Sequence, residues 1–281
     1  MIVAIVGLGL IGGSIARDLR TNGLATDLLG VDKSEAHQQK AIELGLVDEI
    51  VSLEDACFRA DVVLLSIPVS ALKQVLPFSL SHIREETVII DMGSTKNMIA
   101  ESIADHPRRG RIVLAHPMAG TENSGPQAAV DHLFYGKAAI ICDREESDPD
   151  AVKIAERIFK SLFMRILYMD SKDHDQHAAY VSHVSHITSF VLALTVLEKE
   201  KSEANIFNLA SGGFASTVRL AKSSPKMWRD IYEQNADNLL DVLDEYLEKM
   251  KQFRDYIEQG EFDKTRKLME EANKIRKILT K

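Results

Sequence analysis

The chain has 281 residues, of which 45% are hydrophobic and 27% are charged, so it can bury a substantial core and is not disordered. Its net charge at pH 7 is −8 and neither half is basic, which argues against nucleic acid as a partner. The longest apolar runs fall far short of the roughly 18 residues that a membrane span needs, and the first residues lack a basic flank and a cleavage site. We therefore expect a cytoplasmic protein with no membrane partner.

Short β-branched runs alternate with polar-apolar helical stretches from residue 1 to about residue 170. The runs are Ile2–Val6, Leu28–Val31, Val62–Ile67, Val88–Ile90, Ile112–Leu114 and Ala138–Ile141. This alternation is typical of βαβ units and a mostly parallel sheet. It predicts an α/β fold in which residues 1–170 form an N-terminal Rossmann domain with a doubly wound sheet.

A glycine-rich turn follows the first predicted strand. Gly7, Gly9 and Gly12 form the pattern G-x-G-x-x-G directly after Ile2–Val6 and directly before a helical stretch. In a dinucleotide-binding turn the first glycine permits the tight turn, the second lets the backbone approach the pyrophosphate, and the third lets helix and strand pack closely. Free N–H groups at the helix N-terminus attract phosphate. The turn predicts a dinucleotide cofactor, and a glycine turn without a ligand is the alternative.

An acidic residue ends the second predicted strand. Asp32 stands 20 positions after Gly12, where a carboxylate can accept hydrogen bonds from an adenosine ribose. Its charge would repel a 2′-phosphate, which favours NAD over NADP. Two alternatives stay open: Asp32 only begins a turn before the next helix, or the neighbouring Lys33 allows the cofactor to carry a phosphate.

Polar side chains follow three later strands, where open α/β sheets place their ligand crevice. Ser66 is expected to lie over the cofactor, and Ser94 and His116 end two further strands. His116 is placed as a general base with an ordinary pKa near ~6.5, although lone histidines are more often structural. Ser94 is a catalytic candidate, but it or Thr95 could instead cap the helix that follows.

The strand-like runs stop after residue 170. Apolar side chains then recur at spacings of three and four, as in Leu239, Leu240, Leu243, Tyr246, Leu247, Met250 and Phe253. This spacing predicts an all-helical domain over residues 171–281, with connections at Gly212–Gly213 and Ser223–Pro225. Long apolar helices after residue 230 need a partner surface. Trp228 and Phe214 are expected to be core or interface residues and not cofactor contacts.

Four histidines lie close together in this second region: His174, His177, His183 and His186. Their spacing raises the question of a metal site. No cysteine accompanies them, and hydride chemistry needs no metal, so we expect none. The neighbouring Asp173 and Asp175 are equally explained as residues of a first helical turn.

The chain resembles the prephenate and arogenate dehydrogenases of tyrosine biosynthesis, and the resemblance covers nearly its whole length. The runs that carry it are Asp91–Lys96, His116–Glu122 with Ser124 and Gly125, Ser182–His186, Gly212–Phe214 and Arg219–Trp228. Among Rossmann dehydrogenases, the H-P-M-A-G-T-E run is specific to this family. The resemblance implies NAD-dependent oxidative decarboxylation of prephenate by a homodimer, with tyrosine as a possible inhibitor at the active site.

The resemblance also implies roles for single residues. His116 matches the family's catalytic histidine, which accepts the proton of the ring hydroxyl, and Ser94 matches the serine that hydrogen-bonds both that hydroxyl and the histidine. Arg219 matches the arginine that binds a substrate carboxylate, and His186 matches a second histidine of the substrate pocket. Glu122 is a weaker match to an acidic residue near the pocket entrance.

One departure from the family pattern concerns the partner of Arg219. Family members often carry an aspartate three positions before this arginine, where the chain has Ser216. The acidic group that orients Arg219 is therefore left open. Asp175 is another weak match to an acidic residue near the pocket entrance.

Three other functions compete with prephenate oxidation. The substrate could be arogenate, from which the sequence does not separate prephenate because the two differ only at a keto or amino group. A 3-hydroxyacid or imine dehydrogenase of the same architecture usually relies on a different proton donor. A non-enzymatic NAD-sensing protein would keep Gly7, Gly9, Gly12 and Asp32 but would have no need for His116.

Overall fold

A computed structural model describes residues 1–203 and 205–279. The chain divides into two compact units, Met1–Asn235 and Ala236–Lys281. The boundary predicted after residue 170 falls where strands give way to helices, at the start of α7 (Ser171–Ala178). The helices from α7 to α10, however, belong to the first compact unit, so the domain boundary stays a prediction.

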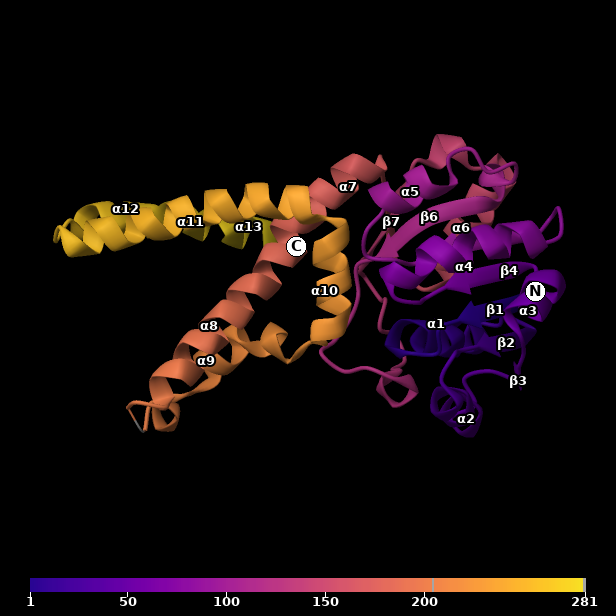
Figure 1. Cartoon of the computed structure of the whole chain (residues 1–281), viewed down its shortest axis with the longest axis horizontal. Coiled ribbons are helices and arrows are strands. Elements are labelled where there is room, and N and C mark those ends of the chain that lie inside the picture. The colour runs from indigo at the N-terminus through magenta and orange to yellow at the C-terminus, as the bar shows by residue number, and fades with distance from the viewer. Residues whose placement is uncertain (204, 280–281) are drawn as a thin grey trace. The chain divides into compact units, whose positions relative to one another are not determined.

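The first unit is built on one eight-stranded sheet (Figure 1). Its strands are β1 (Ile2–Val6), β2 (Asp27–Val31), β3 (Glu49–Ile50), β4 (Val62–Leu65), β5 (Val88–Asp91), β6 (Ile112–Pro117), β7 (Ala138–Cys142) and β8 (Arg165–Met169). They lie in the order β3-β2-β1-β4-β5-β6-β7-β8, and the described pairs are parallel except β6 with β7. The α/β, doubly wound prediction is confirmed, and the order reverses between β1 and β4.

Two strands, β3 and β8, were not predicted from the sequence. β3 has only two residues, and β8 is an edge strand whose side chains are exposed or half-buried. β3 is too short to show an apolar run, whereas β8 does contain one, Ile166–Met169, which the predicted strands omit.

Helices cover both faces of the sheet. They are α1 (Leu10–Thr21), α2 (Glu35–Glu43), α3 (Leu53–Arg59), α4 (Val69–His82), α5 (Asn97–Ile103) and α6 (Pro149–Ser161). Successive β1 side chains enter opposite cores: Val3 and Ile5 pack in the cluster that includes residues of α1 and α6, and Ala4 packs in the cluster that includes residues of α3 and α4. This alternation follows from the period of two in a strand. The sheet and the helices on its two faces form the three layers of a Rossmann arrangement.

Helices follow β8, as predicted. After α7 come a π-helical turn (Ala179–His183), α8 (Val184–Glu200), α9 (Gly212–Thr217) and α10 (Pro225–Gln234). The second unit holds α11 (Ala236–Glu258), α12 (Phe262–Ala272) and α13 (Arg276–Leu279).

The helical run Ser171–Glu200 is long and apolar enough to cross a membrane by length and composition, since one 18-residue window has a mean hydropathy of 1.4. No uninterrupted apolar run marks this segment in the sequence, because Thr188 and Ser189 divide its apolar residues. Only 17% of this window is buried. Val191, Leu194 and Leu197 of α8 are exposed. A helix whose apolar side chains pack against another protein surface would have the same length and apolar composition as a membrane span.

Candidate active site

The turn between β1 and α1 has the backbone that its glycines predict. Gly7 has φ +94°, and a Cβ there would lie 2.4 Å from the carbonyl oxygen of Ser66. A Cβ on Gly12 would lie 2.0 Å from the carbonyl oxygen of Gly7. A Cβ on Gly9 would meet no atom within 4 Å. Gly7 and Gly12 therefore serve the packing of the turn, whereas Gly9 leaves open space beside the start of α1.

The groups around this glycine turn (residues 7–12) fit a dinucleotide. No side chain caps α1, so the N–H groups of its first turn can bind phosphate. The Oγ atom of Ser66 is buried and has no hydrogen-bond partner among the described residues, which leaves it available to a ligand. Gly9, α1 and Ser66 would hold the NAD cofactor, whose nicotinamide accepts hydride when bound.

Asp32 lies at the end of β2 and binds the turn. One carboxylate oxygen accepts a hydrogen bond from the N–H of Leu8 at 2.9 Å, and the other accepts one from the N–H of Ser34 at 2.9 Å. The ring nitrogen Nδ1 of His37 lies 3.4 Å from the first oxygen. Asp32 thus does begin a turn, as the alternative held, but it also ties that turn to the glycine turn. Its contact with a ribose stays a prediction.

His116 occupies the carboxyl-terminal half of β6 and is partly buried. Its Nδ1 lies 2.9 Å from Nε2 of His174, and Nδ1 of His174 lies 2.8 Å from a carboxylate oxygen of Asp175. Burial, and to a lesser degree repulsion from the nearby ammonium of Lys96, hold the pKa of His116 well below 6.5. His116 is therefore neutral over a wider pH range than the ordinary pKa predicted.

A buried ion pair supports the strand that carries His116. The ammonium of Lys96 contacts the carboxylate of Asp91 and donates a hydrogen bond to the carbonyl oxygen of Ala115 at 2.7 Å. Both side chains are fully buried. The second oxygen of Asp91 accepts from the N–H of Gly93 at 2.8 Å. Lys96 thus joins the ends of β5 and β6, which the sequence analysis did not foresee.

The cap of α5 comes from a distant part of the chain. The Asp175 carboxylate accepts hydrogen bonds from the N–H groups of Lys96 at 2.8 Å and Asn97 at 2.9 Å. Asp175 is buried, so its predicted place near a pocket entrance is wrong. Neither Ser94 nor Thr95 caps α5, and the capping alternative for Ser94 is excluded. Ser94 is half-buried and makes no hydrogen bond within the described part of the chain, so the predicted hydrogen bond between Ser94 and His116 is not present there, where His116 pairs with His174 instead.

Arg219 forms an ion pair that was not predicted from the sequence. It lies at the start of the 3₁₀ turn Arg219–Lys222, and its guanidinium is 3.3 Å from the carboxylate of Glu122. The backbone N–H of Glu122 and the Arg219 guanidinium both lower the pKa of Glu122. Ser216 only donates to the carbonyl oxygen of Gly213, at 2.9 Å. Glu122 thus replaces the aspartate that position 216 lacks. The side chain of Arg219 is 52% exposed and free to bind a further anion.

His186 lies on Trp228, with ring centroids 3.7 Å apart. Its Nδ1 is 2.9 Å from the carbonyl oxygen of Ser182, which can only accept, so Nδ1 carries hydrogen and the neutral ring keeps its lone pair on Nε2. Burial lowers the pKa of His186. Trp228 is buried and its indole N–H has no partner among the described residues, so both rings offer polar atoms to a ligand.

The four clustered histidines do not converge. His174 pairs with His116, His183 lies 3.1 Å from the amide of Asn235, His186 stacks on Trp228, and His177 is exposed. Among the residues that the structure describes, no group of three or more His, Cys, Asp or Glu side chains could hold a metal ion. The contact of His174 with His116 was not predicted from the sequence, where His174 is only one of four neighbouring histidines.

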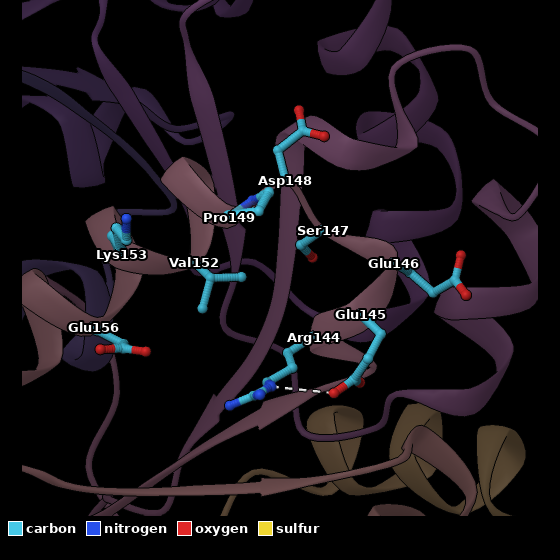
Figure 2. A pocket seen from close by; sticks show the side chains of 9 residues that line it. All are labelled: Arg144, Glu145, Glu146, Ser147, Asp148, Pro149, Val152, Lys153 and Glu156. Carbon is cyan, nitrogen blue, oxygen red and sulfur yellow. Dashed lines mark hydrogen bonds and ion pairs between the residues drawn. The ribbon is translucent and has the colours of Figure 1, made fainter.

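A surface hollow of about 540 Å³ lies elsewhere (Figure 2). Its lining residues come from the turn after β7 and the start of α6, from Arg144 to Glu156, and Arg144 pairs with Glu145 at 3.1 Å. β7 is antiparallel to β6, so the carboxyl end of β7 lies beside the amino end of β6. The hollow next to it is therefore at the opposite end of the strands from His116. This hollow contains none of the predicted site residues.

The fold and the site together define an NAD-dependent dehydrogenase. Residues 15–168 match the family described as prephenate dehydrogenase, nucleotide-binding domain, and residues 170–271 match prephenate dehydrogenase, dimerization domain. The chain belongs to the prephenate dehydrogenase family, as the resemblance predicted.

Individual relatives agree along most of the chain. Prephenate dehydrogenase of Bacillus subtilis is 32% identical over 92% of this chain and 70% of its own length. Cyclohexadienyl dehydrogenase of Zymomonas mobilis is 33% identical over 99% of this chain and 95% of its own length. The structure of prephenate dehydrogenase from A. aeolicus in complex with hydroxyphenyl propionate and NAD+ superposes with a TM-score of 0.90 at 29% identity, covering 100% of this chain and 98% of that one.

Proposed function

We propose that this dehydrogenase oxidises prephenate and releases carbon dioxide and 4-hydroxyphenylpyruvate, in tyrosine biosynthesis. The observation that carries the proposal is His116: a partly buried histidine beyond the glycine turn, with a lowered pKa and with Nε2 unpaired within the described residues. An oxidation of a ring alcohol needs such a neutral base.

The oxidation and decarboxylation of prephenate need few protein groups. As hydride leaves the ring carbon for NAD, His116 accepts the hydroxyl proton and a carbonyl forms. The ring carboxylate then leaves as carbon dioxide, and its electron pair makes the ring aromatic. The ring oxygen takes the proton back from His116, so the base is regenerated. We assign Ser94 to orient the hydroxyl.

The substrate's anionic groups need cations and donors. Arg219 offers a planar guanidinium that can bind a carboxylate through two hydrogen bonds, which Lys cannot do equally well. Glu122 holds that guanidinium in place. His186 offers a further polar atom beside Trp228. We assign these three residues to substrate binding.

Turnover with purified substrates tests the proposal. We expect NADH formation with prephenate, with equal amounts of 4-hydroxyphenylpyruvate and carbon dioxide. A higher kcat/KM with arogenate, with tyrosine as product, would make the chain an arogenate dehydrogenase. NAD binding without turnover of either compound would favour the NAD-sensing alternative.

The cofactor preference gives a separate prediction. Because the Asp32 carboxylate should repel a 2′-phosphate, we expect kcat/KM to be higher for NAD than for NADP by at least about tenfold. Steady-state kinetics with both nucleotides measures this ratio. Equal values would mean that Lys33 or His37 neutralises the carboxylate.

We further propose that the protein is a cytoplasmic homodimer that tyrosine inhibits by occupying the active site. The match to a dimerization domain and the exposed apolar side chains of α8 support pairing through the helical region. Light scattering of the purified protein would give the oligomeric state. Inhibition by tyrosine that is not competitive with prephenate would contradict the second part.

A further inference from the structure

We propose that His174 and Asp175 are positioning residues that hold His116 in a single tautomer, with hydrogen on Nδ1 and a lone pair on Nε2. This inference rests on the proposed function, in which Nε2 of His116 is the base. The geometry that carries it is the continuous chain of hydrogen bonds from Asp175 through His174 to His116, called here the His116 chain.

The chain begins at a group that only accepts. Both carboxylate oxygens of Asp175 accept hydrogen bonds from backbone N–H groups, one from Lys96 and the other from Asn97, and a backbone N–H can only donate. The atom of His174 that faces this carboxylate, at 2.8 Å, is Nδ1. Nδ1 must therefore carry hydrogen, because a lone pair there would face the oxygen's own lone pairs.

The same reasoning passes along the chain to His116. A neutral His174 with hydrogen on Nδ1 has a lone pair on Nε2. That lone pair faces Nδ1 of His116 at 2.9 Å, so Nδ1 of His116 donates and its Nε2 keeps the lone pair. Nε2 makes no hydrogen bond among the described residues and can accept the substrate proton. After it does so, His116 is a cation that still donates to His174.

The surroundings of the His116 chain restrict its hydrogen bonds to the partners described. His174 and Asp175 are each 1% exposed, so water does not compete for their hydrogen bonds. Asp175 is held by α5 as well as by His174, and the backbone carbonyl of Asp175 accepts from the amide of Asn235 at 2.7 Å. The chain thus connects α7 to the base on β6, 58 positions earlier in the sequence.

The tautomer can be measured directly in the free enzyme. We expect ¹⁵N NMR of histidine-labelled protein to show the Nδ1–H form for His116, assigned by the signal that disappears in His116→Asn. In His174→Phe, which removes the acceptor, the signal should move toward the Nε2–H form. His177→Phe is the matched control, because His177 is an exposed histidine of the same helix. A wild-type His116 in the Nε2–H form would overturn the proposal without any variant.

Kinetics show whether the tautomer matters for turnover. We expect His174→Phe to lower kcat by roughly 10–10²-fold, the usual effect of losing a group that orients a functional residue, with KM for NAD unchanged. In a His116→Asn background the same substitution should cost nothing more, because no base is left to orient. Near-wild-type kcat per folded His174→Phe molecule would show a merely structural role and overturn the proposal.

The two proposals fail in different ways. If His116 shows the Nδ1–H form and His174→Phe shifts it, but His116→Asn turns over normally, the chain of hydrogen bonds exists and the function assigned to His116 is wrong. If His116→Asn abolishes turnover but His174→Phe leaves the tautomer unchanged, the base is right and the positioning role is wrong.

Discussion

The glycine turn and the His116 chain both lie at the carboxyl ends of strands, but they are built differently. The turn is a local structure whose groups are mostly backbone atoms between β1 and α1, with Asp32 and Ser66 added from the two neighbouring strands. The His116 chain consists of side chains from β6 and α7, supported by the backbone of α5. A sequence motif identifies the glycine turn, because its residues are close together in the sequence and their spacing determines the local backbone geometry. The His116 chain exists only after the segments have packed.

This difference predicts separable defects. Damage to the glycine turn should affect cofactor binding and leave proton transfer intact, whereas damage to the His116 chain should do the reverse. Four experiments test the separation.

The largest effect is expected from His116→Asn. The variant keeps a polar side chain but removes the base, so kcat should fall by roughly 10²–10⁴-fold while the dissociation constant for NAD stays nearly unchanged. Single-turnover and NAD-binding measurements on the folded variant give both numbers. Retention of more than about a tenth of wild-type turnover would contradict the role of His116.

The glycines offer the opposite test. In Gly9→Ala the new Cβ meets no protein atom, so the melting temperature should hold while the NAD dissociation constant rises by about 10²-fold, because the Cβ takes the space of the pyrophosphate. In Gly12→Ala the Cβ lies 2.0 Å from the Gly7 carbonyl, so stability should fall as well. Calorimetry and NAD titration of both variants check this. Unchanged NAD affinity in Gly9→Ala would mean that the cofactor does not approach this backbone.

A smaller effect is expected from Arg219→Ala. Loss of a hydrogen-bonded charge should raise KM for prephenate by roughly 10–10²-fold and leave NAD affinity unchanged. Glu122→Gln should raise it less, since the guanidinium remains but loses its charged partner. If Arg219→Ala weakened NAD binding instead, the arginine would belong to the cofactor site.

The smallest effect is a shift of the pH profile. The base acts when neutral, so kcat/KM is lost as pH falls through the pKa of His116, which burial holds well below 6.5. An ordinary histidine would give a half-point near pH ~6.5, whereas we expect the half-point of the acidic limb to lie well below it. Circular dichroism at each pH controls for unfolding. A half-point at pH 6.5 would show that the ring is solvated in the free enzyme.

The sequence by itself determined the alternation of strands and helices over residues 1–170 and the glycine turn, and it predicted Ser94 and His116 as separate candidates at strand ends. Periodicity and turn chemistry are local, so they can be read before the chain is folded. The family resemblance added roles to residues, and the comparisons confirmed the family.

Only the tertiary structure decided how those residues are held. Glu122 and Arg219 are 97 positions apart, and His116 and His174 are 58 apart, so no local pattern predicts either pair. Asp175 looked like an ordinary residue of a helix, yet it caps α5 and anchors the His116 chain. The physical reason is burial: once packing excludes water, each polar group must find a partner inside the protein, and the fold alone determines which partner lies within reach.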